Sequence, residues 1–258
     1  MTEKQDDRPT KTSGKGIIYA ELAAGMALFG SATPVSKIVT SAMPVFVGSA
    51  LRVAIGAAVL APFVYRSSGQ IGKFSRYDWL LVGVISVFGM FGFSALMLYG
   101  MKMVPGVVGA TVMSTTPAVT SAASMMFLDD KPTWRKIGAV VLAVTGVFVL
   151  QAAQGGDERD SYGGGLILGS ALVFAAVCCE AVYTLVGKKA SETADPVLVA
   201  FLASVIAIPL FTPFAIWQWP NFSLAEVPTK AWLAVIWYGA GTLAAGTWLW
   251  YSGLKRAE

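Results

Sequence analysis

The chain has 258 residues, of which 55% are hydrophobic and 13% charged, and its mean hydropathy is +0.65. This composition excludes an ordinary water-soluble globule and favours an integral membrane protein. The formal net charge is only +4, which gives no indication of nucleic-acid binding. The sequence contains no histidine, so a histidine proton relay is also excluded.

Eight apolar stretches are predicted to cross the bilayer as helices, because about 20 helical residues span the roughly 30 Å of hydrocarbon. In chain order they cover residues 17–39, 44–65, 79–100, 105–128, 135–151, 164–187, 196–217 and 231–252. Residues 1–15 are polar and are predicted to form a tail; they are no signal peptide, because the first apolar stretch is itself long enough to span. The predicted fold class is therefore an all-α integral membrane protein.

The lysine and arginine residues indicate how these spans are oriented. Most of the 19 fall in the tail and in the connectors on the N-terminal side of the membrane, and few fall in the opposite connectors. Because positive residues concentrate in cytoplasmic loops, we predict a cytoplasmic N-terminus. The net charge of +4 is then a consequence of membrane orientation.

The sequence contains an internal repeat with an offset of 151 to 153 residues. "KIVTSAMP" (Lys37–Pro44) matches "KASETADP" (Lys189–Pro196), and Trp79 matches Trp232. Because the repeated unit holds five spans, an odd number, the second copy is predicted to cross the membrane in the opposite direction. Inverted repeats of this kind are typical of secondary transporters, whose substrate site lies near the middle of the membrane between the copies.

The repeat divides the chain into three predicted parts. A cytoplasmic tail covers residues 1–15, a first five-helix repeat covers residues 16–151, and a second repeat covers residues 163–258. The second repeat stops after its third helix, and the counterpart of residues 106–150 is missing from the sequence. We therefore expect the chain to be a truncated form of a ten-helix protein.

A family resemblance is visible in the fourth and fifth predicted spans. The stretch "VVGATVMSTTPAVTSAASMMFLDDKPTWRKIGAVVLAVTGVFVL" (Val107–Leu150) resembles the corresponding helices of the EamA-type drug/metabolite transporter superfamily. "ALFGSATPVSKIV" (Ala27–Val39) resembles the first helix of that superfamily. The family turn reads Leu-Gly-Glu-Arg, whereas here Leu128 is followed by two aspartates and a lysine. This departure is confined to a turn, and the resemblance extends from about residue 17 onward.

The resemblance implies ten helices around a central cavity and alternating access without ATP. It is nearest to bacterial inner-membrane exporters of amino acids and related metabolites, and it implies a multi-pass protein of the inner membrane with a small-molecule substrate. The sequence contains no "GxxxxGK[ST]" phosphate-binding loop. No cofactor, metal site or enzyme activity is predicted, because the sequence shows no metal-ligand cluster and no nucleophile–base pair.

Glu180 places a carboxylate in the middle of the sixth predicted span. It lies about eight residues, or roughly 12 Å, from Lys188 at the membrane boundary. A glutamate is too short to reach water over that distance, so its side chain is predicted to face protein or a cavity. One interpretation is a pathway residue that binds a substrate ammonium group or exchanges a proton. The alternative is a neutral glutamic acid hydrogen-bonded to a neighbouring helix.

Arg52 is the second ionisable residue placed deep in a predicted span. It lies on one helical stripe with Gly48 and Gly56, about 12 Å from Pro44 at the outer boundary. Its long side chain could reach the interface or bond a neighbouring helix, and it could also bind a substrate carboxylate. Both interpretations stay open at the level of sequence.

Other residues could line a substrate pathway, although helix packing explains them equally well. They are Tyr99, Tyr183, Ser114, Thr115 and Trp248. Pro34 and Pro117 remove backbone hydrogen bonds within predicted spans, so they predict kinks that could serve gating.

The predicted function is export of a small zwitterionic metabolite, most plausibly an amino acid, by alternating access. Glu180 and Arg52 are the candidate partners for its two charged ends, and facilitated diffusion and proton coupling both stay open. A carrier of sugar-phosphate or nucleotide-linked metabolites is an alternative, for which only Arg52 and Lys37 would supply positive charge. A noncatalytic membrane scaffold is a further alternative, which the inverted repeat disfavours.

Overall fold

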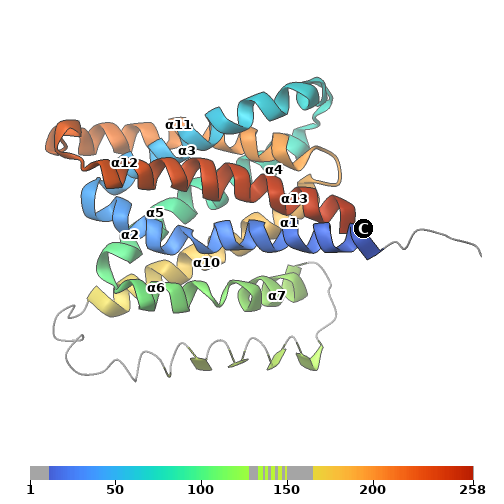
Figure 1. Cartoon of the computed structure of the whole chain (residues 1–258), viewed down its shortest axis with the longest axis horizontal. Helices are drawn as coiled ribbons and strands as arrows, with labels where there is room; N and C mark the ends of the chain where they lie inside the picture. The colour runs from blue at the N-terminus through green and yellow to red at the C-terminus, as the bar shows by residue number, and fades with distance from the viewer. Residues whose placement is uncertain are drawn as a thin grey trace, which may run out of the picture.

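The computed structural model describes residues 12–127, 133–135, 137–138, 141–142, 145–146, 149 and 165–257. The helices run side by side along the long axis of the molecule (Figure 1). They are α1 (Thr12–Gly30), α2 (Ala32–Ala42), α3 (Val45–Val64), α4 (Arg76–Val84), α5 (Phe93–Met103), α6 (Gly106–Met113), α7 (Thr116–Phe127), α10 (Gly165–Ala190), α11 (Pro196–Gln218), α12 (Thr229–Ile236) and α13 (Gly246–Ala257). The 3-10 helices are η1 (Tyr65–Lys73), η3 (Trp219–Asn221) and η4 (Leu224–Glu226), and the π-helices are η2 (Ile85–Gly92) and η5 (Trp237–Ala245).

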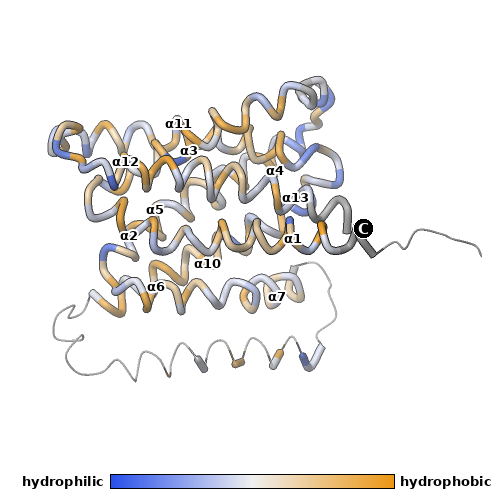
Figure 2. Tube along the Cα trace, in the orientation of Figure 1, coloured by the Kyte–Doolittle hydropathy of each residue, from blue (hydrophilic) through white to orange (hydrophobic). Residues whose placement is uncertain are grey.

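Within the described residues, 5 helical stretches are long and apolar enough to cross a membrane. They are Gly16–Ala42, Val45–Val64, Arg76–Met103, Gly165–Ala190 and Pro196–Gln218. Apolar residues run along the helices, and hydrophilic residues gather at the two ends of the bundle where the chain turns (Figure 2). The prediction of an all-helical membrane protein is thus confirmed for this part of the chain. The count of eight spans stays a prediction. Helix α1 begins at Thr12, so the end of the predicted tail is helical, and the rest of the tail and most of the fifth predicted span lie outside the described residues.

Two helices are interrupted close to the prolines that predict kinks. The first stretch breaks at Ser31, between α1 and α2, and Pro34 follows within one turn. The fourth breaks at Ser114 and Thr115, between α6 and α7, just before Pro117. Each proline lacks the N–H group that would bond the carbonyl four residues earlier, so the helix is weakest at these positions. Gating at the breaks stays a prediction.

The arrangement of the helices fits the repeat predicted from the sequence. The π-helix η5 begins 152 residues after the π-helix η2, which is the offset found in the sequence. Helix α3 packs against α11, α1 packs against α13, and α5 packs against α10. An offset of 152 residues relates α1 to α10, α3 to α11, and α5 to α13. The inverted orientation of the two copies stays a prediction.

Glycines allow the closest of these helix contacts. A Cβ atom added at Gly100 on α5 would lie 2.9 Å from the carbonyl oxygen of Gly169 on α10. A Cβ atom at Gly169 would lie 3.1 Å from the carbonyl oxygen of Gly100. The two backbones therefore touch at these positions, which is the role that small residues have in membrane helix packing.

Candidate functional site

Arg52 is buried halfway along α3, with only 6% of its surface exposed. One of its Nη atoms donates a hydrogen bond of 2.5 Å to the hydroxyl of Ser94 on α5. Its guanidinium carbon lies 4.5 Å from the ring centroid of Tyr238 in η5 and 5.5 Å from that of Phe93. Arg52 therefore points into the bundle and does not extend to the membrane surface.

Glu180 on α10 faces the break between α6 and α7. Its Oε2 atom accepts a hydrogen bond of 3.1 Å from the hydroxyl of Thr116, the first residue of α7. Helix α10, which carries Glu180, packs against α5, which carries Ser94. In the described part of the chain no direct ion pair joins Arg52 to Glu180. We call Arg52, Ser94, Thr116, Glu180 and Tyr238 the central polar cluster.

Two buried polar atoms of the central polar cluster have no hydrogen-bond partner among the described residues. They are the Nε atom of Arg52 and the hydroxyl of Tyr238, whose side chain is fully buried. A buried polar group without a partner costs about 1–3 kcal/mol, so native proteins keep few of them outside functional sites. These two atoms mark the cluster as a place where a polar ligand would restore missing hydrogen bonds.

Glu180 and Arg52 are the two predicted pathway residues that the structure brings together. Ser94, Thr116 and Tyr238 were missed. No sequence pattern distinguishes Ser94 from the other small polar residues of its span, whereas Thr116 precedes the predicted kink at Pro117 and could have been considered. Tyr238 lies in an apolar stretch in which no sequence pattern indicates that its ring contacts Arg52.

The predicted hydroxyl residues of the fourth span bond their own helix. Thr115 is buried and donates to the carbonyl of Val112, and Ser114 is exposed and donates to the carbonyl of Thr111. These bonds satisfy the helix carbonyls next to the break. The structure thus assigns both side chains a local hydrogen bond.

The predicted aromatic residues lie at three separate places. Trp248 is 43% exposed on the outside of the bundle. Tyr183 packs against η2, where its Cδ2 atom would lie 2.5 Å from a Cβ atom at Gly89. Tyr99 lies near the end of α5, and its hydroxyl accepts a hydrogen bond of 3.1 Å from Gln218. Gln218 also lines a cavity, so Tyr99 lies close to it.

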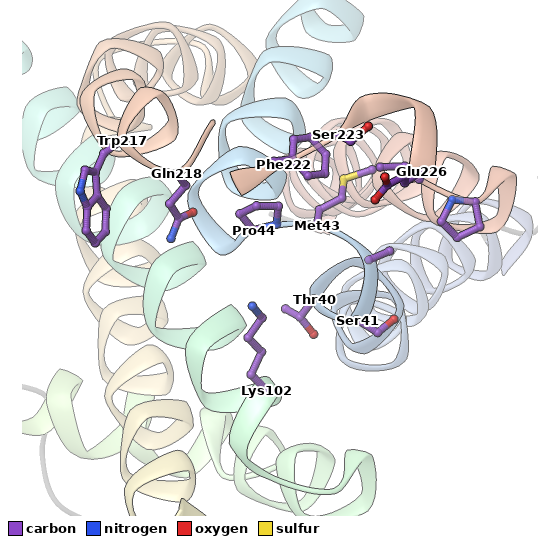
Figure 3. Close-up of a pocket in the computed structure, with 13 residues that line it drawn as sticks. Thr40, Ser41, Met43, Pro44, Lys102, Trp217, Gln218, Phe222, Ser223 and Glu226 are labelled. Carbon is purple, nitrogen blue, oxygen red and sulfur yellow. The ribbon is translucent and has the colours of Figure 1, made fainter. Parts of the chain in front are cut away.

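That cavity is an open hollow of about 790 Å³ at the end of the bundle where α2, α5 and α11 finish and α3 and α12 begin. We call it the vestibule (Figure 3). Its polar lining residues are Thr40, Ser41, Lys102, Gln218, Ser223 and Glu226. The predicted cytoplasmic N-terminus would place the vestibule on the outer side of the membrane.

A group of aromatic side chains, which we call the aromatic layer, lies next to the vestibule residue Gln218. The ring centroid of Phe46 lies 4.7 Å from that of Phe214, 5.6 Å from that of Tyr99 and 6.2 Å from that of Phe91. Phe91 also lies 4.8 Å from Phe211 between ring centroids.

The depth of Phe46 follows from the order of residues along α3. Along α3, Pro44 lines the vestibule, Phe46 belongs to the layer, and Arg52 lies deeper. Gln218 forms hydrogen bonds with two residues of the layer. Its Oε1 atom accepts from the backbone N–H of Phe46 at 2.9 Å, and its amide nitrogen donates to the hydroxyl of Tyr99.

The opposite end of the bundle is crossed by side-chain hydrogen bonds. The hydroxyl of Thr193 donates to Asp78 at 2.9 Å. The backbone N–H of Asp195 donates to Gln70 at 3.0 Å, and the hydroxyl of Ser67 donates to the carboxylate of Asp195 at 3.4 Å. These bonds join η1 and α4 to the turn between α10 and α11.

Lys37 has a structural partner that the sequence did not reveal. Its Nζ atom donates to the carbonyl oxygens of Met101 at 2.6 Å and Val104 at 2.5 Å, at the end of α5. The last carbonyls of a helix lack partners within the helix, and a cation is favourable there. Lys37 therefore caps α5 and is not directed toward a substrate.

Replacing Lys37 by methionine is expected to lower the free energy of unfolding by about 1–3 kcal/mol, the contribution of hydrogen bonds to a charged group. Thermal unfolding of the purified protein in detergent measures the change. Lys73→Met in exposed η1 serves as the control and should leave the midpoint unchanged. Equal midpoints for the two variants would contradict the capping role of Lys37.

Comparison with known proteins identifies the family. Residues 14–151 and 167–258 match the EamA-like transporter family. The chain is 29% identical over 238 residues to the uncharacterized transporter YetK of Bacillus subtilis, covering 92% of this chain and 72% of YetK. It is also 29% identical over 182 residues to the threonine/homoserine exporter RhtA of Escherichia coli K12, covering 66% of this chain and 55% of RhtA.

A solved crystal structure shares the fold. It aligns with a TM-score of 0.64 and 20% sequence identity over 96% of this chain and 80% of the other chain. The family match extends over both predicted repeats, which agrees with the bundle of long apolar helices. The chain therefore belongs to the EamA-like transporter family and is a multi-pass membrane transporter.

Proposed function

We propose that this transporter exports small zwitterionic metabolites, above all amino acids, across a bacterial inner membrane by alternating access. The observation that carries the proposal is the central polar cluster, which holds one buried cation and one carboxylate that do not pair directly. In this proposal two inverted five-helix repeats move relative to each other around the cluster, and the N-terminus is cytoplasmic.

The two charged groups match the two ends of an amino acid. The Arg52 guanidinium presents several donors in one plane, which suits a carboxylate, and its Nε atom is unpartnered in the described structure. The Glu180 carboxylate suits an ammonium group, with Thr116 holding one of its oxygens in place. Charges placed deep in a membrane protein are costly and are usually kept for function. The name of the relative RhtA, a threonine/homoserine exporter, supports the same substrate class.

The alternative of a phosphorylated or nucleotide-linked substrate has less support. Such an anion calls for several basic side chains, and the central polar cluster contains one, Arg52. Lys37, the other candidate, is bonded to two carbonyls of α5 and the following residue. A passive scaffold would gain nothing from a buried guanidinium and carboxylate, which apolar side chains could replace without a desolvation cost. Glu180 is the residue in the cluster that could carry a coupling proton.

Counterflow in proteoliposomes tests the proposal. Vesicles loaded with unlabelled L-threonine are expected to accumulate labelled L-threonine from outside, and a panel of other amino acids defines the range of substrates. Glu180→Gln is expected to slow counterflow at least about tenfold, because the neutral amide no longer offers a negative charge to the ammonium group of the substrate. Glu192→Gln, at an exposed glutamate beyond the end of α10, is the matched control.

The outcomes separate the substrate class from the role of the residue. Absence of counterflow for every zwitterion in the unmodified protein would contradict the proposed substrate class. Normal counterflow in Glu180→Gln would leave the class standing and remove Glu180 from the site.

A further inference from the structure

We propose that the vestibule is a second, peripheral binding site for the zwitterionic substrate, with Lys102 holding its carboxylate and Glu226 its ammonium group. This inference rests on the proposed function and deepens it. In this proposal the substrate binds in the vestibule when it enters from, or leaves to, the compartment that the vestibule faces.

Two side chains of opposite charge line the vestibule from different walls. Lys102 extends from the last turn of α5, and Glu226 lies in η4 on the connector to α12 (Figure 3). Both are exposed, and in the described part of the chain neither has a hydrogen-bond or ion-pair partner. The two charges are therefore free to bind a solute that enters the space between them.

The rest of the vestibule supplies volume and hydrogen-bonding groups. Its volume of about 790 Å³ lies in the range of about 300–1,000 Å³ that is typical of small-molecule sites. Thr40 and Ser41 donate to carbonyls of their own helix, which leaves their hydroxyl oxygens as acceptors for an ammonium group. Ser223 adds a further hydroxyl on the wall that carries Glu226.

The pair of charges selects for a zwitterion. A zwitterion is attracted by both Lys102 and Glu226, whereas a simple anion is attracted by one and repelled by the other, and a simple cation likewise. Opposite charges on low-dielectric walls also raise the local concentration of a matching solute. The vestibule therefore favours the charge pattern that the central polar cluster also presents.

The floor of the vestibule explains why this site is separate from the central one. Gln218 lines the vestibule and also bonds Phe46 and Tyr99 of the aromatic layer. Phe46 and Tyr99 lie between the vestibule residues and Arg52 and Ser94 in the order of residues along α3 and α5. Substitutions at Lys102 and Glu226 should change the KM for transport from the vestibule side and leave the maximal rate nearly unchanged.

A charge-swap experiment tests the inference with radiolabelled L-threonine as the probe. Right-side-out and inside-out membrane vesicles from cells that produce the protein are compared, and vesicles from cells without it give the background. Lys102→Glu is expected to raise KM about threefold to tenfold from the vestibule side, since each exposed charge has a modest effect. The double variant Lys102→Glu with Glu226→Lys should restore KM, because a zwitterion can bind in the reversed direction.

The control and the outcomes keep the two proposals distinguishable. Lys230→Met removes an exposed lysine at the start of α12 that does not line the vestibule, and it should leave KM unchanged. A KM that rises in one vesicle orientation and is restored by the swap supports the vestibule site. Transport of L-threonine with the same KM in all variants and both orientations overturns the vestibule site alone, whereas no transport of any zwitterion by the unmodified protein overturns the proposed function.

Discussion

Replacing Arg52 by methionine is expected to reduce counterflow of L-threonine at least about a hundredfold. The substitution removes the cation of the central polar cluster and leaves the hydroxyl of Ser94 without its donor. Truncating one partner of a buried, hydrogen-bonded charge pair between two binding partners typically costs about 2–5 kcal/mol of binding free energy. A loss of about 3 kcal/mol in substrate binding corresponds to more than a hundredfold in affinity.

The lysine variant sharpens this prediction. Arg52→Lys keeps the positive charge but loses the planar group that lies against the ring of Tyr238 and donates to Ser94 at the same time. We expect partial transport, between that of the methionine variant and that of the unmodified protein. Arg76→Met, at an exposed arginine at the start of α4, is the control. Full activity in Arg52→Met, with normal thermal stability, would remove Arg52 from the substrate pathway.

Replacing Gly100 by alanine is expected to destabilise the bundle strongly. The new Cβ atom would lie 2.9 Å from both the carbonyl oxygen of Gly169 and the backbone nitrogen of Val173. Backbone atoms of a packed helix cannot rotate away as a side chain can, so α5 and α10 must separate. We expect a loss of about 3 kcal/mol, which lowers the unfolding midpoint by roughly 6–12 °C.

A second glycine in the same membrane-spanning stretch provides the matched control. Gly83 in α4 has no atom within 4 Å of an added Cβ, so Gly83→Ala is expected to keep or slightly raise the midpoint. Thermal unfolding in detergent, followed by size-exclusion chromatography, measures both variants. If both glycine variants unfold at the same temperature, the close contact of α5 with α10 does not limit stability.

Much of the fold was predictable because a membrane imposes a simple length and polarity on its helices. The apolar stretches, the breaks near Pro34 and Pro117, and the depth of Glu180 and Arg52 all follow from local composition and spacing. Residues that act through a partner on another helix did not follow in this way. Lys37 illustrates the difference, because its position in an apolar span suggested an anion site while its ammonium group reaches the end of α5.

The central polar cluster was predictable in its charges and not in its supporting residues. An isolated charge in an apolar stretch is conspicuous, whereas Ser94 and Tyr238 become meaningful only through their distance to Arg52. Trp248 shows the converse error, because its depth in a span does not tell which face of the helix it occupies, and it lies on the outside. The π-helices η2 and η5 could not be predicted from the sequence, because no residue pattern distinguishes them from an α-helix.

The hydrogen bonds at the end of the bundle opposite the vestibule stabilise the closed arrangement of that end. Opening that end requires Thr193, Asp195 and their partners to separate, which gives up three bonds worth about 1 kcal/mol each. A difference of about 3 kcal/mol corresponds to roughly a hundredfold in population. Under the proposed alternating access, these bonds favour the closed state of this end, and the substrate's own contacts must offset a comparable free energy when it opens.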